Sequence, residues 1–316
     1  MKNDAIELKG LSKNYGNHTV VDKLDLNIRK GEVFGLLGPN GAGKSTTILM
    51  MLGLTEPTSG TVKVCGIDST RDPVEVKRKV GYLPENLGFY EDRTGLENLV
   101  YTAKLNQIHS DQAQQRALQM LKRVGLAEAG EKKVGKYSRG MRQRLGLADV
   151  LIKSPEVIIL DEPTLGIDPK GVQELLKLIA QLSKEDKLTV LLSSHHLHQV
   201  QQVCDRVGLF VDGRLIAEGD IETLSSQLFG GQPLTVEMAV SLKGSGSDLR
   251  KTIGKMKGVD RIREEDGSYI IDCSQDVTHE LAQKAIKSGA ILNHLSKKKF
   301  GLDEIYQRYF EERENN

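Results

Sequence analysis

Nine residues, Gly38-Pro-Asn-Gly-Ala-Gly-Lys-Ser-Thr46, form the strongest pattern in this chain of 316 residues. They match the spacing G-x-x-x-x-G-K-[ST] at Gly38, Gly43, Lys44 and Ser45. Glycines let the backbone approach a phosphate closely, and successive N–H groups of such a loop line an anion site. The lysine would reach the β- and γ-phosphates, and the following hydroxyl would bind Mg²⁺. The residues predicted to surround the phosphates are Gly38, Pro39, Asn40, Gly41, Ala42, Gly43, Lys44, Ser45 and Thr46.

The segments on both sides of this loop support the same interpretation. Residues 32–37 have the composition of a buried strand, and residues 45–52 have the pattern of a helix. The helix would add the positive end of its dipole to the anion site. An ordinary glycine-rich turn is the alternative, but a strand before and a helix after the pattern disfavour it. The sequence therefore predicts a protein that binds a nucleoside triphosphate.

Composition excludes several broad classes of protein. Hydrophobic residues make up 38% of the chain, charged residues 28%, and the formal net charge is +1, so no basic field indicates a nucleic-acid partner. No apolar run has the length of a membrane-spanning helix, and the charged N-terminus MKNDAIELKG lacks the apolar core of a signal peptide. Three scattered cysteines have no metal-ligand spacing. We expect a cytoplasmic chain that reaches a membrane only through a partner.

The residues before and after the loop predict an N-terminal antiparallel sheet and a helical insert. Residues 6–29 alternate apolar and polar side chains around a turn at residues 14–17, which predicts an antiparallel sheet. Tyr15 lies in that turn; on the residues alone, packing within the turn is favoured over stacking on an adenine. Residues 60–66 and 80–84 predict short strands, and Glu85 follows the second. Helical periodicity over residues 96–105 and 112–124 predicts a helical insert at about residues 87–145.

The end of this insert, Tyr137-Ser-Arg-Gly-Met-Arg-Gln-Arg144, precedes an apolar helix predicted over residues 145–151. Ser138 is a candidate N-cap. A serine and a glycine before a helix can also form an anion site. The residues alone leave simple capping and anion binding equally open.

Two adjacent carboxylates follow the most apolar strand of the chain. Residues 157–160 predict a central buried strand that ends at Asp161 and Glu162. Ligands of open α/β sheets bind at the carboxyl ends of strands. We expect Asp161 to hold Mg²⁺ through water and Glu162 to face the water that attacks the γ-phosphate. Carboxylates that only cap a loop are the weaker alternative beside a phosphate loop.

A further buried strand, residues 189–194, ends at His195 and His196. Adjacent side chains of a strand point to opposite faces, so at most one histidine should contact the γ-phosphate. The pair has no other ligand at the spacing of a metal site. Between the two strands, Asp168 and Pro169 predict the N-cap and first turn of a helix.

The C-terminal part differs in composition. Residues 207–211 and 215–217 predict a hairpin, and a domain boundary is predicted near residues 229–233. Beyond it we predict, in order, a strand, a helix, a hairpin, a helix and a strand, followed by a last helix over residues 302–312. That order predicts a small α+β domain of the ferredoxin-like type.

Together these motifs resemble the ATP-binding subunit of ABC transporters, over about residues 4–228. Gly38–Thr46 is similar to the Walker A loop, and Val157–Glu162 is similar to Walker B with its catalytic glutamate. Ser138-Arg-Gly-Met141 stands where the family has LSGGQ. The resemblance implies an α/β P-loop NTPase domain over residues 1–229, with a mixed sheet core, an N-terminal antiparallel β subdomain and a helical subdomain. An accessory domain would follow over residues 230–316.

The resemblance also implies roles for single residues. Glu162, His195 and Lys44 would be catalytic. Arg139 and Met141 replace a glycine and the glutamine of the signature, and Glu85 replaces the usual Q-loop glutamine, where a carboxylate can approach Mg²⁺. Beyond the phosphate loop, the residues implied to bind ATP are Tyr15, Glu85, Ser138, Gly140, Met141 and Asp168, and those implied to bind Mg²⁺ are Ser45, Asp161 and Glu85.

In this family two such subunits close head to tail around two ATP molecules, and the resemblance implies a homodimer here. The replacements at Arg139, Met141 and Glu85, together with the C-terminal domain, are typical of the subgroup that pairs with a separate ABC-2-type permease, often an exporter. The permease would dock on the helical insert and the Glu85 loop. The subunit would lie at the cytoplasmic face of the membrane and bind no nucleic acid.

Two other functions compete with transport. Soluble family members that act on ribosomes carry two cassettes in tandem, and those that act on DNA contain a long coiled coil. This chain has one copy of each motif and no sustained heptads. A regulatory ATP sensor without turnover is disfavoured because Glu162 and His195 are both present. The sequence therefore favours an ATP-hydrolysing transporter subunit.

Overall fold

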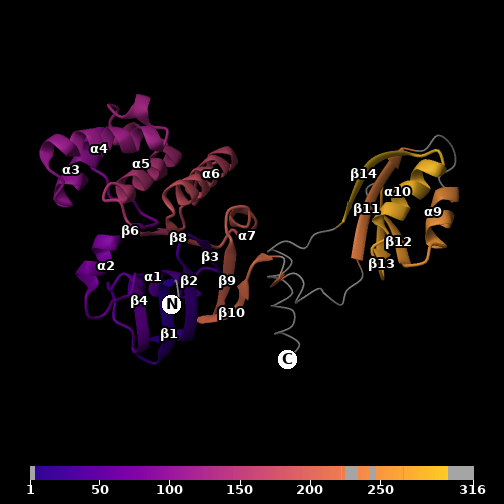
Figure 1. Ribbon diagram of the computed structural model, residues 1–316, viewed down its shortest axis with the longest axis horizontal. Helices are drawn as coiled ribbons and strands as arrows, with labels where there is room; N and C mark the ends of the chain where they lie inside the picture. Colours follow the sequence, from indigo (N-terminus) through magenta and orange to yellow (C-terminus); the bar gives the residue numbers. More distant parts are fainter. Residues whose placement is uncertain (1–3, 222, 225–233, 242–246, 266, 298–316) are drawn as a thin grey trace. The chain divides into compact units, whose positions relative to one another are not determined.

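The computed structural model describes residues 4–221, 223–224, 234–241, 247–265 and 267–297 (Figure 1). The chain divides into two units, Met1–Leu224 and Ser225–Asn316, and each has a hydrophobic core of its own. The boundary predicted between residues 229 and 230, and the helix predicted over residues 302–312, lie outside the described residues. Within the described part of the chain, no helix is both long and apolar enough to cross a membrane.

A six-stranded sheet carries the loops of the first unit that bear the predicted motifs. Its strand order is β10-β9-β3-β8-β7-β6, and only β10 is antiparallel to its neighbour. Every residue of β3, β7 and β8 is buried, as expected for parallel strands covered on both faces. The strands are β3 (Val33–Leu37), β6 (Val80–Leu83), β7 (Val157–Asp161), β8 (Thr189–Ser194), β9 (Arg206–Val211) and β10 (Arg214–Gly219). Parallel direction brings the carboxyl ends of β3, β7 and β8 to one edge.

The predicted N-terminal antiparallel sheet is confirmed, with strand order β2-β1-β4-β5. Its strands are β1 (Asp4–Tyr15), β2 (His18–Arg29), β4 (Ser59–Val64) and β5 (Ile67–Asp68). The apolar face of this sheet shares one core with helix α1 (Lys44–Met51) and with buried residues of β3, β7 and β8, such as Phe34, Ile159 and Leu191. The phosphate loop therefore leaves β3 and enters a helix that is held between two sheets.

The helical subdomain consists of α3 (Gly95–Leu105), α4 (Ser110–Arg123) and α5 (Arg139–Leu151), which pack together beside α6 (Pro169–Asp186) (Figure 1). Helix α5 was predicted to begin at residue 145 but begins at Arg139. Its earlier start follows from Ser138, whose side chain caps the helix by accepting a hydrogen bond from the Met141 amide. Two short helices, α2 (Pro73–Lys79) and α7 (Leu197–Val200), also belong to this unit.

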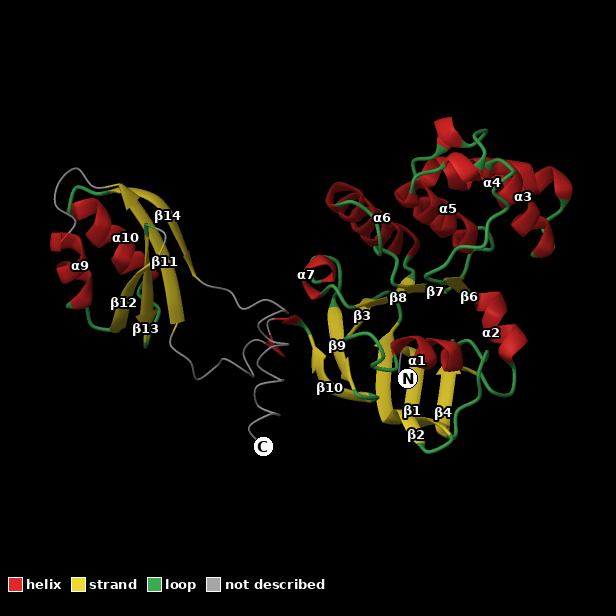
Figure 2. Cartoon of the chain, turned by 180° about the vertical axis from the view of Figure 1, so that it is seen from behind, coloured by secondary structure: helices red, strands yellow, loops and turns green. Residues whose placement is uncertain are grey.

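The second unit has the ferredoxin-like order of elements that the sequence predicted (Figure 2). The described elements are β11 (Leu234–Ser241), α9 (Ser247–Gly254), β12 (Val259–Glu265), β13 (Ser268–Cys273), α10 (Thr278–Lys287) and β14 (Ile291–Lys297). The strands form one antiparallel sheet in the order β12-β13-β11-β14. Residues of the sheet such as Met238 and Ile271 pack against Ile253 of α9 and Leu281 of α10.

Candidate functional site

The phosphate loop is shaped by glycines at both of its ends. A Cβ on Gly38 would overlap the carbonyl oxygen of Phe210, and a Cβ on Gly43 would lie 2.5 Å from the carbonyl oxygen of Val20. Gly43 also has a φ of 103°, in the left-handed region that favours glycine. Only glycine therefore fits where the loop leaves β3 and where it enters α1.

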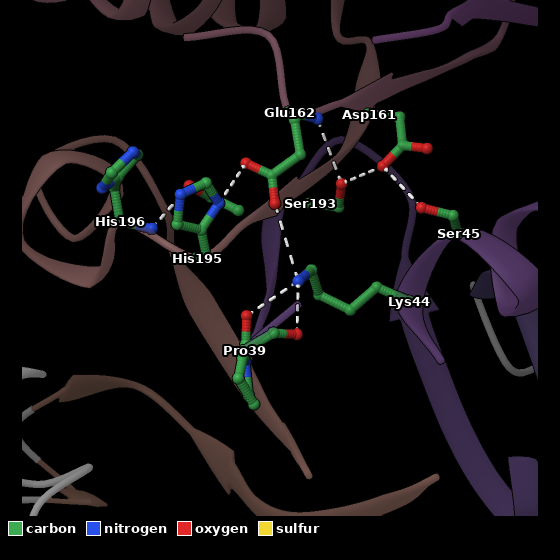
Figure 3. A network of polar contacts seen from close by, with 10 residues as sticks. Pro39, Lys44, Ser45, Asp161, Glu162, Ser193, His195 and His196 are labelled. Atoms are coloured by element: carbon green, nitrogen blue, oxygen red, sulfur yellow. Dashed lines mark hydrogen bonds and ion pairs between the residues drawn. The ribbon is translucent and has the colours of Figure 1, made fainter. Parts of the chain in front are cut away.

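Lys44 is folded back over this loop (Figure 3). Its Nζ donates to the carbonyl oxygens of Gly38 at 2.7 Å and Pro39 at 3.0 Å, and lies 3.5 Å from Oε1 of Glu162. The side chain is 6% exposed. Burial lowers the pKa of Lys44, while the carboxylates of Glu162 and Asp161 act in the opposite direction. The cation is thus partly desolvated and close to the loop that would receive a triphosphate.

Asp161, at the end of β7, belongs to a short chain of oxygen atoms. Its Oδ1 accepts a hydrogen bond from the Ser193 hydroxyl at 2.5 Å and lies 3.4 Å from Oγ of Ser45. Ser193 Oγ in turn accepts a hydrogen bond from the Glu162 amide at 3.2 Å. Ser193 was not among the predicted site residues. A hydroxyl and one carboxylate are the hard oxygen donors that suit Mg²⁺ beside substrate phosphates, so Ser45 and Asp161 fit this ion.

Glu162 follows β7 in a left-handed conformation, with a φ of 49°. Its Oε2 lies 3.0 Å from Nδ1 of His195, and its Oε1 is the oxygen near Lys44 (Figure 3). The carboxylate is nearly buried, and among the described residues Oε1 lies in an ion pair with Lys44 but has no hydrogen-bond partner. Glu162 is therefore held on two sides, by Lys44 at Oε1 and by His195 at Oε2.

The alternation of side chains along a strand predicted that His195 and His196 point to opposite faces. In the structure the two rings lie side by side instead. Strand β8 ends at Ser194, so His195 and His196 lie beyond its regular pleat. Their ring centroids are 3.9 Å apart with an angle of 42° between the planes. His195 is the one that contacts Glu162, while the His196 amide donates to Oγ of Ser194.

The predicted signature residues gather in a different place from Lys44 and Glu162. Ser138, Gly140, Met141 and Asp168 line one cavity of about 300 Å³ at the start of α5 and α6. Asp168 caps α6 by accepting a hydrogen bond from the Gly171 amide at 3.2 Å. Arg139 does not line this cavity; its Nε donates to the carbonyl oxygen of Leu165 at 2.5 Å. The first unit thus has two separate groups of predicted ATP-binding residues.

Tyr15 and Glu85 lie outside both groups. Tyr15 is 52% exposed at the turn between β1 and β2, with Nζ of Lys13 at 5.0 Å from its ring centroid. Glu85 is exposed just after β6. The exposed ring can receive a flat partner, while the predicted part of Glu85 in an Mg²⁺ site stays a prediction.

Comparison with known proteins agrees with this architecture. The model of the protein family described as "ABC transporter" matches residues 21–165 of this chain. The Bacitracin transport ATP-binding protein BcrA of Bacillus licheniformis is 44% identical over 213 residues, which cover 67% of this chain and 69% of that protein. The Linearmycin resistance ATP-binding protein LnrL of Bacillus subtilis (strain 168) is 34% identical over 291 residues, which cover 92% of each chain.

A solved structure shares the fold of the first unit. The ATP-binding cassette MJ0796, in a dimeric post-hydrolysis state bound to ADP and Pi, has a TM-score of 0.62 and 27% identity, covering 68% of this chain and 98% of that one. The two sheets, the phosphate loop and the carboxylates at the end of β7 agree with these similarities. The chain belongs to the ATP-binding proteins of ABC transporters, and it is the ATP-hydrolysing subunit of such a transporter.

Proposed function

We propose that two copies of this subunit close head to tail around two ATP molecules and drive a separate ABC-2-type permease at the cytoplasmic face of the membrane. The permease would export an antibiotic-like compound that is toxic to the cell. The names of the relatives, which concern bacitracin transport and linearmycin resistance, support this class of cargo. The dimeric state of MJ0796 supports the pairing of two subunits. The observation that carries the catalytic part is Glu162 held between Lys44 and His195.

In this proposal Lys44 leaves the carbonyl oxygens of its own loop and binds the β- and γ-phosphates. Its departure frees Oε1 of Glu162, which then accepts the proton of the attacking water. His195 fixes the other oxygen of that carboxylate and adds a polar contact near the γ-phosphate. Ser45 and Asp161, and in our prediction Glu85, would hold Mg²⁺, which would neutralise charge on the phosphates.

The second group of residues completes the site from the other subunit. Ser138, Gly140 and Met141 lie at the positive end of α5, which suits a γ-phosphate. Asp168 borders the same cavity. Tyr15, which is exposed at the turn between β1 and β2, would stack on the adenine. One subunit would therefore bind ATP, but two would be needed to enclose it.

The decisive experiment is Glu162→Gln, with Glu156→Gln as its control. Glu156 precedes the same strand but is an exposed partner of Lys79. Loss of the general base should lower kcat by about 10²- to 10⁴-fold while ATP binding is kept. Size-exclusion chromatography should then show a dimer that persists only with ATP, and Glu156→Gln should behave as the wild type. Unchanged turnover in Glu162→Gln would refute the assignment of the base.

The partner is tested separately by purification from native membranes. The subunit should co-purify with an integral-membrane protein. If it sediments with ribosomes instead, the transport part of the proposal fails, although the assignment of Glu162 stands.

A further inference from the structure

Ser193 lies near the end of β8, where this strand pairs with the end of β7. It is fully buried, and the register of the two strands sets it opposite Asp161. A buried hydroxyl needs hydrogen-bond partners, which are most often main-chain groups nearby. The partners of Ser193 are instead the side chain of Asp161 and the amide of Glu162. Ser193 therefore connects the two acidic residues of the site (Figure 3).

The Ser193 hydroxyl has one proton and two lone pairs, and its partners decide how they are used. The carboxylate of Asp161 only accepts, so the hydroxyl donates its proton to Oδ1 at 2.5 Å. A lone pair of the same oxygen then accepts the Glu162 amide at 3.2 Å. Hydrogen bonds to a charged acceptor are stronger than those between neutral groups. Asp161 thus orients the hydroxyl so that its oxygen faces the backbone of Glu162.

The backbone that this hydroxyl holds has an unfavourable conformation. The φ of Glu162 is 49°, in the left-handed region that side chains rarely adopt, and the next residue is Pro163. A residue before proline is normally extended, so this conformation persists only where contacts fix it. The Glu162 amide donates to both the carbonyl oxygen and the hydroxyl of Ser193, and its carbonyl accepts from the Leu165 amide. Two of these three hydrogen bonds therefore involve Ser193.

We propose that Ser193 is a positioning residue for ATP hydrolysis, and that its hydroxyl holds the Glu162 backbone where the carboxylate faces the attacking water. Rotation about φ of Glu162 moves its Cβ and with it the whole carboxylate. A general base acts only within hydrogen-bond reach of the proton that it removes, and a small displacement lowers the rate strongly. The proposal rests on the proposed function, in which Glu162 is the base. It adds the residue that fixes the position of that base.

The bland alternative is that Ser193 only satisfies its own buried hydroxyl. Ser183 of α6 represents that case, because it is also buried and its hydroxyl donates to the carbonyl oxygen of Leu188 at 2.8 Å. Leu188 precedes β8, whereas Ser193 is near the other end of this strand. Ser183→Ala is therefore the matched control: it removes a buried hydroxyl beside the same strand, away from Glu162.

The first experiment compares the ATPase kinetics of Ser193→Ala, Ser193→Cys and Ser183→Ala in the full chain. Loss of the Ser193 hydroxyl should lower kcat about tenfold or more and change KM less than about twofold, because the base and not ATP binding is disturbed. Cysteine fills the space of serine with a weakly hydrogen-bonding thiol, so Ser193→Cys should be as slow as Ser193→Ala. Ser183→Ala should keep the wild-type kcat. Thermal unfolding with and without ATP checks that each variant is folded.

Size-exclusion chromatography with ATP adds a readout that does not depend on turnover. Ser193→Ala should form the ATP-dependent dimer that is expected of Glu162→Gln, because both variants bind ATP and hydrolyse it slowly. A Ser193→Ala protein that stays monomeric with ATP would show that nucleotide binding is disturbed, which would overturn the proposal.

A double-mutant cycle with Glu162→Gln tests whether Ser193 acts through this base. In single-turnover reactions Ser193→Ala should slow hydrolysis about tenfold or more when Glu162 is present, and should have little effect in the Glu162→Gln background. Additive effects, an unchanged kcat in Ser193→Ala, or a wild-type kcat in Ser193→Cys would overturn the proposal and leave the assignment of Glu162 intact. Unchanged turnover in Glu162→Gln alone would instead refute the base itself.

Discussion

Lys44 has two kinds of neighbour, which affect its pKa in opposite directions. On the loop side, Lys44 is buried and its Nζ donates hydrogen bonds to neutral carbonyl oxygens. On the opposite side lies the carboxylate of Glu162. Burial is the larger effect, so the pKa of Lys44 falls below its usual 10.5. A bound triphosphate adds negative charge and raises the pKa again. Nucleotide binding is therefore coupled to the protonation of one identified side chain.

This coupling predicts proton uptake on ATP binding at alkaline pH. Between the lowered pKa and 10.5 the free protein has partly lost the Lys44 proton, and the complex regains it. Affinity for ATP should accordingly fall as pH rises through that window. In the same window the unfolded chain binds more protons than the free folded protein, so the contribution of Lys44 to the free energy of unfolding rises with pH. Titration calorimetry in two buffers of different ionisation enthalpy measures the uptake.

The control for this prediction is Lys44→Arg, whose guanidinium stays protonated throughout the range. It should bind ATP without the alkaline proton uptake, even if its affinity is lower. Equal proton uptake in the wild type and in Lys44→Arg would assign the effect to another group.

Residue-scale prediction from the sequence succeeded where a motif within one segment marks the residue. Lys44, Asp161 and Glu162 were singled out from their own neighbours along the chain, and the structure brings them together. Ser193 escaped notice because a serine at the end of an apolar strand carries no signal of its own. Its role depends on the register that places it opposite Asp161 in the neighbouring strand. That register is a long-range property of the sheet.

At the scale of elements, Ser138 at the start of helix α5 has both a structural role and a predicted functional role. Ser138 caps the helix through the Met141 amide at 3.2 Å, which occupies its hydroxyl in the single chain. The same hydroxyl, at the positive end of the helix, is predicted to meet the γ-phosphate bound by a second subunit. The two uses can be separated by comparison with an N-cap that faces no nucleotide.

Thr94 supplies that comparison, because it caps α3 of the same subdomain in a capping box with Glu97. Ser138→Ala and Thr94→Ala should each cost about 1 kcal/mol in the free energy of unfolding. Only Ser138→Ala should also weaken the ATP-dependent dimer, which analytical ultracentrifugation of both variants in the Glu162→Gln background measures. Similar dimerisation of the two variants would leave Ser138 with the capping role alone.

Element boundaries were predictable only where a local signal marks them. Asp168 and Pro169 marked the start of α6 correctly, whereas α5 begins six residues before its apolar run because the cap, not the apolar pattern, sets its start. The two-residue strand β5 and the four-residue helix α7 are too short to show any periodicity. Arg139 also became interpretable only in three dimensions: a Cβ on Gly166 would lie 2.8 Å from its Nε, so the guanidinium packs where that side chain is absent.

At the scale of the whole molecule, the core between the two sheets of the first unit and the core described in the second unit share no residue. The ferredoxin-like order of the second unit was predictable from the succession of strand-like and helix-like segments along the chain, and the alternation of buried and half-buried residues in β13 is regular. The pairing of β11 between β13 and β14 was not visible in any single segment, and it followed only from the fold type. Separate cores predict separate folding.

Adjacent isoleucines of β13 test this independence. Ile271 is buried against α9 and α10, whereas Ile270 points to the other face of the sheet, where it pairs in register with Glu237 and Arg263. Ile271→Asp places an unpaired carboxylate in the second core and should cost about 3 kcal/mol or more, while Ile270→Asp should cost much less. Calorimetry of the full chain should show that Ile271→Asp removes one thermal transition and leaves the transition that ATP shifts upward. A single transition that moves as a whole would show instead that the two units unfold together, because a disturbed second core would then destabilise the ATP-binding core as well.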